Sequence, residues 1–322
     1  MTTVDRGVVA RGVQAAALAP SLHNSQPWRF RVIGEAVDVY ADRSRRLDVL
    51  DASGRELLIS VGAALFTLRL ALRAEGWTTR HTLFPDPGSP DLVARVELGT
   101  ASAPAEAVTT LAAAIPRRHT NRLPFAEAVV PADAVEELTG AAAAEGATLT
   151  IAGAVSRDAI LGLGQVAERR LRAQGGYRAE LGHWTRPARG RHDGIPPTAV
   201  GPWDALERLP LRDFGLMQPQ PWRTSERFEA YPTIAVLATA GDGPPEWVGA
   251  GQALQHVLLA ATRLRLATTP ISQPVELPAI RELLTDTTAG QWAQMIIRLG
   301  YGPPAAATPR RPLAEIMDGE AR

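Results

Sequence analysis

The chain has 322 residues, 45% of them hydrophobic and 21% charged, and its formal net charge is zero. Nucleic-acid and anionic-membrane binders need a basic face, so a neutral chain predicts neither kind of partner. Cysteine and lysine are both absent, which excludes disulfides, thiolate metal sites, a Walker A lysine and lysine Schiff bases.

The same sequence limits where the protein works. No apolar run is expected to reach the length of a membrane span, and the first residues lack the regions of a signal peptide, so we expect a cytoplasmic protein. The six histidines show no metal-ligand spacing, and no metal site is predicted. Any phosphate must be held by arginine, whose planar fork suits a bidentate contact.

Hydrophobic periodicity predicts an α+β chain made of two loosely similar parts. A capping box, Ser-Gly-Arg-Glu at 53–56, is expected to start a long apolar helix, and a second such helix lies in the other part. In chain order we expect a helix at 5–18, a hairpin at 30–39, a helix at 57–74, strands at 79–84 and 92–98, helices at 106–115 and 132–144, a strand at 148–152, a helix at 157–172, a strand at 233–238, a helix at 248–266 and a strand at 293–300.

Residues 183–231 fit none of these patterns, because they are rich in proline and carry three tryptophans. A disordered linker would be poor in aromatic residues, so we expect an ordered loop anchored by buried tryptophans. Such a loop is either a lid over a binding site or a surface excursion that covers core, and the sequence does not choose between them.

Four short motifs could carry chemistry. Residues 19–30, APSLHNSQPWRF, form a proline-stiffened turn with short polar side chains, suited to the edge of a flat heteroaromatic ring. Residues 117–122, RRHTNR, combine cations with a hydroxyl and suit a phosphate beside an electron-rich ring edge. A threonine-proline loop follows the second long helix at 268–273, and a Gly-Tyr turn with an Arg-Arg-Pro-Leu element spans 300–313.

Together these motifs resemble those of the FMN-dependent nitroreductase family. The first resembles its Pro-Ser-x-x-Asn ring-binding motif, and the second its Arg-x-Ser/Thr-x-Arg element for phosphate, ribityl and the N1/C2 edge of the ring. The third matches a loop that points a backbone N–H at flavin N5, although Ser272-Gln273 stands where the family often has Glu-Gly. The fourth resembles the family's C-terminal signature.

The order of the motifs implies how they assemble. Ordinary nitroreductases are homodimers with FMN between subunits, whereas here the Pro-Ser motif precedes the arginine element in one chain. That order is similar to the Acg-type branch, whose members are fused dimers with a lid. The resemblance implies a nitroreductase-like α+β fold of two tandem halves forming an intramolecular pseudo-dimer: residues 1–104, and residues 105–322 with a lid at 183–231 and a C-terminal arm at 303–322.

The resemblance also implies FMN as the cofactor, hydride transfer through flavin N5, no catalytic side chain and a monomeric chain. A small planar molecule is the expected substrate, with NAD(P)H as a candidate hydride donor. A non-catalytic protein that stores FMN under its lid is the alternative. The expected cofactor-binding residues are Pro20, Ser21, Leu22, Asn24, Gln26, Arg118, His119, Thr120, Arg122, Pro270, Ile271, Ser272, Arg310 and Arg311.

Overall fold

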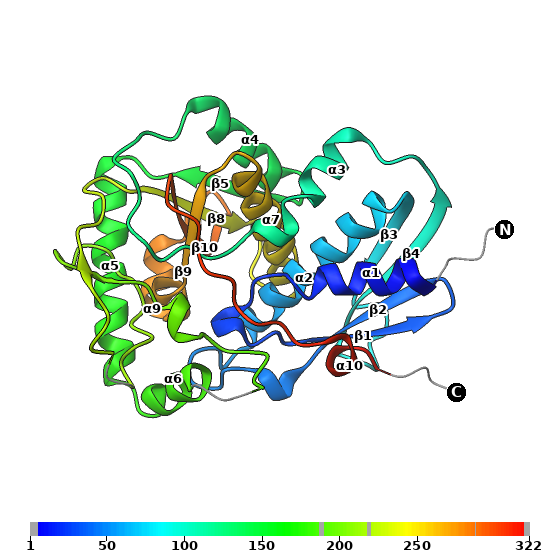
Figure 1. Ribbon diagram of the computed structural model, residues 1–322, viewed down its shortest axis with the longest axis horizontal. Coiled ribbons are helices and arrows are strands. Elements are labelled where there is room, and N and C mark those ends of the chain that lie inside the picture. The colour runs from blue at the N-terminus through cyan, green and yellow to red at the C-terminus, as the bar shows by residue number, and fades with distance from the viewer. Residues whose placement is uncertain (1–5, 187–189, 218–219, 287, 319–322) are drawn as a thin grey trace.

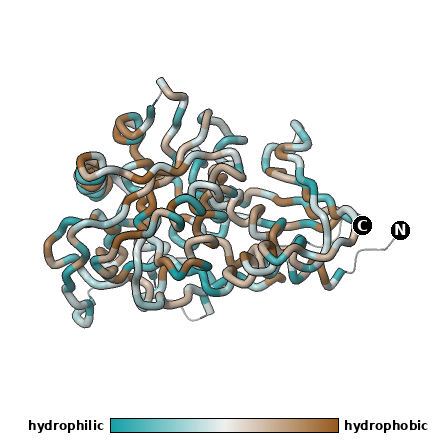
Figure 2. The backbone as a smooth tube through the Cα atoms, turned by 90° about the horizontal axis from the view of Figure 1, so that it is seen from above, coloured by the Kyte–Doolittle hydropathy of each residue, from teal (hydrophilic) through white to brown (hydrophobic). Residues whose placement is uncertain are grey.

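The computed structural model describes residues 6–186, 190–217, 220–286 and 288–318. Two four-stranded antiparallel sheets, each with its own helices, lie on either side of two long central helices (Figure 1). The first sheet has the order β1-β2-β4-β3 and the second the order β5-β8-β10-β9. Hydrophobic stretches occur in both halves (Figure 2), so each half has an apolar core of its own.

The elements follow the predicted order closely. In the first half they are α1 (Arg6–Ala16), β1 (Trp28–Ile33), β2 (Ala36–Ala41), α2 (Arg55–Ala74), β3 (Trp77–Leu83) and β4 (Leu92–Ala101). In the second they are α3 (Glu106–Ala112), α4 (Ala132–Ala143), β5 (Ala147–Ile151), α5 (Ala154–Ala173), α6 (Tyr177–Thr185), β6 (Trp203–Asp204), β7 (Ser225–Glu226), β8 (Thr233–Thr239), α7 (Pro244–Arg263), β9 (Ala267–Ile271), α8 (Gln273–Glu276), α9 (Pro278–Arg281), β10 (Trp292–Gly300) and α10 (Leu313–Ile316).

The central helices α2 and α7 hold the two halves together by direct backbone contact. A Cβ atom on Gly62 would lie 2.2 Å from the carbonyl oxygen of Val248, and one on Gly251 would lie 2.0 Å from that of Ile59. Only glycine permits such an approach. Val248 of α7 joins the core of the first half, and Ile59 of α2 joins that of the second, so the two cores interlock.

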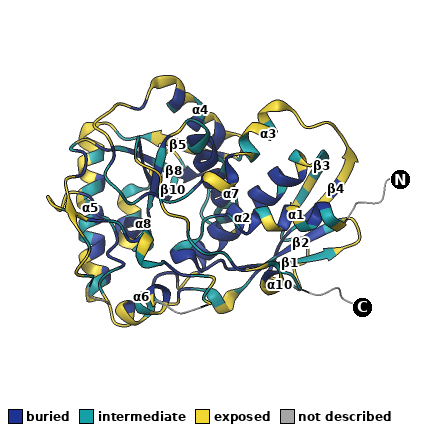
Figure 3. Cartoon of the chain, viewed as in Figure 1, coloured by how far each residue is buried: buried dark blue, intermediate teal, exposed yellow. Residues whose placement is uncertain are grey.

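Helix α2 corrects two of the sequence predictions. It is long and apolar enough to span a membrane by length and composition alone, contrary to expectation, but 83% of its most apolar window is buried inside the protein (Figure 3). It also begins without the predicted capping box. Gly54 adopts a left-handed conformation at the N-cap, and the Asp51 carboxylate accepts the N–H groups of Glu56 and Leu57 at 2.9 and 2.7 Å.

The C-terminal arm crosses back from the second half to the first (Figure 1). Met317 forms a parallel bridge with Phe30 of β1, and the Asp318 N–H donates to the Phe30 carbonyl at 2.9 Å. Ile316 of α10 is fully buried in the core of the first half. The arm therefore ties the end of the chain to the neighbourhood of the first motif.

The segment predicted as a lid is ordered where it is described, with residues 187–189 and 218–219 outside the described part. It contains the end of α6 and a short parallel pair, β6 with β7. Trp184 is buried, as expected, but Trp203 and Trp222 are 42% and 57% exposed, so the prediction of buried tryptophan anchors was wrong for these two. Trp203 instead packs under the Arg223 guanidinium, whose carbon lies 3.6 Å from the ring centroid.

Candidate functional site

A pocket lies where the two halves and the lid segment meet. It holds about 770 Å³ of empty space, counting the part open to solvent. The first half lines it with residues 20–23 and with one face of α2, and the second half with residues 120 and 122 and the end of β9. Residues 210–212 and 214 of the lid segment complete the wall, so this segment reaches the pocket and does more than cover core.

The structure brings the predicted motifs together around this pocket. Eight of the fourteen predicted residues line it: Pro20, Ser21, Leu22, Thr120, Arg122, Pro270, Ile271 and Ser272. The early turn and the arginine motif, a hundred residues apart in sequence, therefore face one cavity. The expected cofactor roles of the fourteen residues remain predictions.

The third motif has a different local structure from the one expected. Thr268 to Ile271 belong to strand β9, at the edge of the second sheet, and not to a loop. Pro270 is tolerated there because an edge position does not require its missing N–H. Thr120 forms a bridge with Thr268, and the Asn121 N–H donates to the Thr268 carbonyl at 2.9 Å, so the arginine motif continues the sheet beyond β9.

Three more predicted residues form a cationic cluster beside the pocket. Arg118 and Arg310 each donate from Nη2 to the Leu18 carbonyl, at 3.1 and 3.4 Å. Burial lowers the pKa of His119, and the guanidinium groups of Arg118 and Arg310 lie close enough to lower it further. Because Leu18 immediately precedes the turn that lines the pocket, the cluster adjoins the pocket wall.

Three guanidinium groups at the pocket, those of Arg118, Arg310 and Arg122, have no counterion among the described residues. Burial lowers the pKa of Arg118 to about 9, with Arg310 adding to the shift, and burial lowers that of Arg310 to about 10. Burial and, secondarily, Arg212 lower the pKa of Arg122 to about 10. In the described part of the chain, no carboxylate pairs with any of the three, and the Nε atoms of Arg118 and Arg310 have no hydrogen-bond partner. A buried cation without a partner is costly, so this arrangement suits an anionic ligand.

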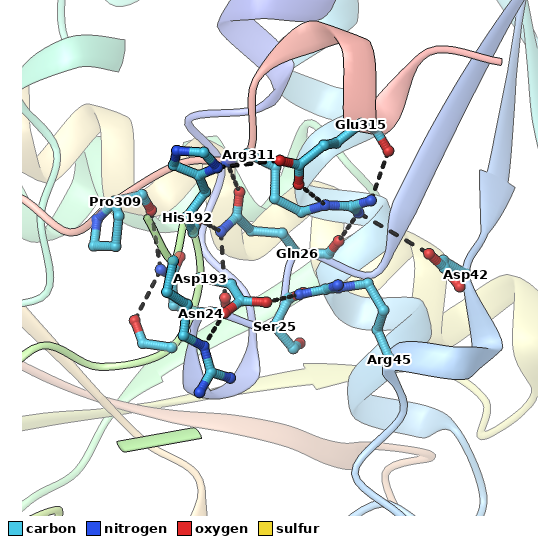
Figure 4. A network of polar contacts seen from close by, with 12 residues as sticks. Asn24, Ser25, Gln26, Asp42, Arg45, His192, Asp193, Pro309, Arg311 and Glu315 are labelled. Carbon is cyan, nitrogen blue, oxygen red and sulfur yellow. Dashed lines mark hydrogen bonds and ion pairs between the residues drawn. The ribbon is translucent and has the colours of Figure 1, made fainter. Parts of the chain in front are cut away.

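The remaining three predicted residues, Asn24, Gln26 and Arg311, connect segments of the protein to one another (Figure 4). Gln26 donates from Nε2 to the His192 carbonyl at 2.8 Å and accepts the Arg311 N–H at Oε1, also at 2.8 Å. Asn24 donates from Nδ2 to the carbonyls of Gly194 and Pro309, at 2.9 and 3.0 Å. These bonds join the first motif to the lid segment and to the C-terminal arm.

The first motif also carries an unusual backbone. His23, Asn24 and Gln26 have φ angles of 50°, 55° and 50°, in the left-handed region that non-glycine residues rarely adopt. The Gln26 N–H donates to Ser21 Oγ at 2.9 Å, and the bonds of Asn24 and Gln26 hold the turn from outside. Such strain persists only where the surroundings fix it, and it is typical of binding sites.

A buried acidic and basic cluster forms the floor of the pocket. Glu56 lines the pocket and pairs with Arg55, while Asp51 lies one turn before the helix and Glu276 pairs with Arg212 at 2.6 Å. Burial raises the pKa of Glu56 to about 7, Arg55 opposes this shift, and Glu276 and Asp51 add to it. The folded protein therefore holds a proton on Glu56 that the unfolded chain releases above pH 4.5, and stability should fall as pH rises from 4.5 to 7.

Comparison with known proteins identifies the family. No protein-family model matches the chain. A protein of Mycobacterium tuberculosis named "Putative NAD(P)H nitroreductase acg" is 33% identical over 329 residues, covering 100% of this chain and 98% of its own. The chain belongs to the nitroreductase family, in its Acg-type branch.

A second relative and a solved structure are also similar to the chain. The M. tuberculosis protein named "Putative NAD(P)H nitroreductase Rv3131" is 32% identical over 98% of this chain and 92% of its own length. Among solved structures, the FMN-dependent nitroreductase NfnB from Mycobacterium smegmatis, in complex with NADPH, matches 67% of this chain and 100% of its own, with 16% identity and a TM-score of 0.40.

In this nitroreductase, several residues that line the pocket were not singled out by the sequence. Glu56 and Ser60 face the pocket from helix α2, one turn apart, and their helical spacing alone resembled ordinary core periodicity. Arg212 and Phe214 come from the lid segment, whose path no periodicity predicts. His23 also lines the pocket, and the only indication in the sequence was its position between Leu22 and Asn24, which are both predicted to bind the cofactor.

Proposed function

We propose that this chain binds FMN in the pocket and acts as an FMN-dependent oxidoreductase on a small planar substrate. The observation that carries the proposal is a set of partly or fully buried guanidinium groups that have no counterion among the described residues: Arg118 and Arg310 beside the pocket, and Arg122 in its wall. FMN is a planar ring joined to a phosphate, and a pocket that adjoins a cationic cluster offers a place for both parts.

The residues present fit the cofactor. Arg118, Arg310 and His119 would hold the phosphate, because two guanidinium groups there have an Nε atom without a partner. Arg122 and Thr120 would contact the electron-rich edge of the ring, and the end of β9 would support its face. A cation at that edge favours the reduced, anionic flavin and so raises its reduction potential.

When bound, FMN supplies hydride transfer at its N5 atom. The protein's part is to bind and orient the ring, to exclude water through the lid segment, and to keep Arg122 at the pyrimidine edge. The names of the M. tuberculosis relatives support NAD(P)H as the hydride donor. We also propose that the protein is a monomer, because residues of one chain line the pocket on all the sides described. Its location in the cytoplasm stays a proposal from the sequence.

The proposal is tested by purifying the protein and measuring its bound flavin. The wild-type protein should be yellow, with one FMN per chain, and should elute as a monomer. Replacing Arg118 and Arg122 together by Ala should abolish FMN retention while the far-ultraviolet circular dichroism stays unchanged. Unchanged flavin content in this folded double variant would contradict the assignment.

A second function, storage of FMN without turnover, is favoured by one observation. Pro210, Leu211, Arg212 and Phe214 of the lid segment line the pocket, so this segment lies over the position proposed for the ring. Anaerobic NADPH separates the two functions. Rapid bleaching of the flavin absorbance supports an oxidoreductase, whereas bleaching no faster than that of free FMN supports storage.

A further inference from the structure

The buried cluster at the floor of the pocket contains one more acid than base. Its acids are Asp51, Glu56 and Glu276, its bases are Arg55 and Arg212, and the side chains of all five are buried. With every group ionised, one negative charge would have no compensating cation, and such a charge is costly in a buried place. A proton on one of the carboxyl groups removes this cost.

Glu56 is the carboxyl group of this cluster that reaches the pocket. Among the described residues, it lines the pocket and the other two acids of the cluster do not. Its Oε1 accepts a hydrogen bond from Nη2 of Arg55, whereas its Oε2 makes no hydrogen bond with a described residue. Oε2 is therefore available to exchange a proton with a molecule in the pocket.

The groups packed around Glu56 favour its acid form up to neutral pH. Burial raises the pKa of Glu56 to about 7, and Glu276 and Asp51 add to the shift, while Arg55 and Arg212 oppose it. Burial also raises the pKa of Asp51, but only to about 6. A general acid works best when its pKa lies near the working pH, and Glu56 meets this condition.

The other titratable groups of the pocket wall are poor proton donors near neutral pH. Burial lowers the pKa of His23 well below its ordinary value, and Arg212 and Arg122 lower it further, so this imidazole stays neutral. Burial and Arg212 lower the pKa of Arg122 only to about 10. Arg212 keeps its proton in the ion pair with Glu276, at 2.6 Å. Glu56 is thus the best placed acid that the pocket offers.

We propose that Glu56 is a catalytic acid, which gives the proton of its carboxyl group to the substrate that receives the hydride. The inference rests on the proposed function, because the hydride comes from NAD(P)H by way of bound FMN. With the hydride the substrate gains two electrons and one hydrogen, and the proton from Glu56 supplies the second hydrogen and neutralises the added charge. Glu56 is left as a carboxylate beside Arg55 and takes a proton back from water.

The number of protons taken up on reduction tests this at equilibrium, without turnover. Negative charge added to the flavin should make Glu56 hold its proton more tightly, because like charges nearby disfavour the carboxylate. The wild-type holoprotein should therefore take up one extra proton with two electrons just above pH 7. The midpoint potential of bound FMN, measured against reference dyes, should then change by an extra tenfold in the reduction equilibrium, or about 30 mV, per pH unit.

Glu56→Gln removes the proton and keeps an oxygen that accepts from Arg55, so this variant should lack the extra dependence on pH. Glu180→Gln is the control and should match the wild type, because burial also raises the pKa of Glu180, which lies outside the pocket. The wild-type pH dependence in Glu56→Gln, with FMN retained, would overturn the inference and leave the proposed function intact. Loss of FMN from Glu56→Gln would also overturn it, because Glu56 would then belong to the cofactor site. A wild-type protein without FMN would instead reject the proposed function itself.

Reoxidation of the reduced holoprotein separates proton delivery from electron transfer. The two probes are tetramethyl-1,4-benzoquinone, which takes up protons with its electrons, and ferricyanide, which takes up electrons alone. Glu56→Gln should react with the quinone roughly a hundredfold more slowly than the wild type and with ferricyanide at the wild-type rate. In the wild type, the quinone reaction should slow as the pH rises through the pKa of Glu56. Equal slowing with both probes, or no slowing with the quinone, would refute a proton transfer from Glu56.

Discussion

Arg118 gives the sharpest test of the cationic cluster, because its replacement should change binding and stability in opposite directions. Its guanidinium is 3% exposed, donates to the Leu18 carbonyl and has an Nε atom without a partner. Arg118→Met keeps an unbranched side chain of similar length and removes the charge. FMN binding should then weaken, while the cofactor-free protein should become more stable.

The magnitudes follow from burial and charge. A charge-assisted hydrogen bond contributes roughly 1.5 to 3 kcal/mol, so FMN affinity should fall between about tenfold and a hundredfold. A pKa of about 9 in place of 12.5 corresponds to roughly 4 to 5 kcal/mol of electrostatic cost in the cofactor-free fold. The lost bond to Leu18 and the lost packing offset part of this gain, so we expect the apoprotein to be about 1 to 3 kcal/mol more stable.

Two titrations of apoprotein check the prediction: FMN binding by quenching of flavin fluorescence, and urea unfolding without FMN. Arg117→Met is the matched control, because Arg117 is the adjacent residue, exposed to solvent, and should change neither quantity appreciably. Unchanged FMN affinity in Arg118→Met, or an equal loss in the control, would refute the argument. An Arg118→Met apoprotein that loses both stability and FMN affinity would also refute the argument. In that case the buried cation would stabilise the fold, and loss of structure would explain the weaker FMN binding.

Two further predictions concern the core. Gly251→Ala should destabilise the protein by more than about 3 kcal/mol, because the new methyl group would meet the backbone of α2. Gly249→Ala on the same helix has open space around the new methyl group and should stabilise the protein by about 0.5 to 1 kcal/mol. Urea unfolding of both variants checks this, and equal effects on stability would contradict the close contact between the helices. Glu56→Gln should remove the part of the fall in stability between pH 4.5 and 7 that Glu56 causes, while Asp51, whose pKa is raised to about 6, keeps its own part. Relative to the wild type, the variant should therefore gain up to roughly 3 kcal/mol between pH 4.5 and pH 8. Parallel stability curves would contradict a raised pKa of Glu56.

The sequence by itself determined most of the local structure. Periodicity and turn residues predicted both long central helices, the hairpin at Gly34 and seven of the ten strands, all except β6, β7 and β9, because these elements depend on neighbours a few residues apart. The motifs, through their resemblance to a family, also predicted eight residues of the pocket wall. Their residue types were informative because a chain without lysine has only arginine to hold an anion in a buried site.

Local rules failed where a distant or competing group made the decisive contact. Ser53 accepts only the Arg55 N–H, at 3.4 Å, and Asp51 accepts the N–H groups of Glu56 and Leu57, because a left-handed Gly54 turns the chain before the helix. Pro270 sits in a strand because the edge of the sheet tolerates it, which no sequence window records. The two exposed tryptophans of the lid segment likewise depend on a path that no periodicity specifies.

The arrangement of the site was decided by tertiary structure alone. Arg118 and Arg310 are 192 positions apart, and only folding places both against one carbonyl, where no carboxylate of the described residues pairs with them. The ring nitrogens of His23 have no hydrogen-bond partner among the described residues, because the lid segment brings the apolar ring of Phe214 against the imidazole. Burial and the absence of a partner depend on everything that surrounds a side chain, whereas a sequence motif specifies only the side chain itself.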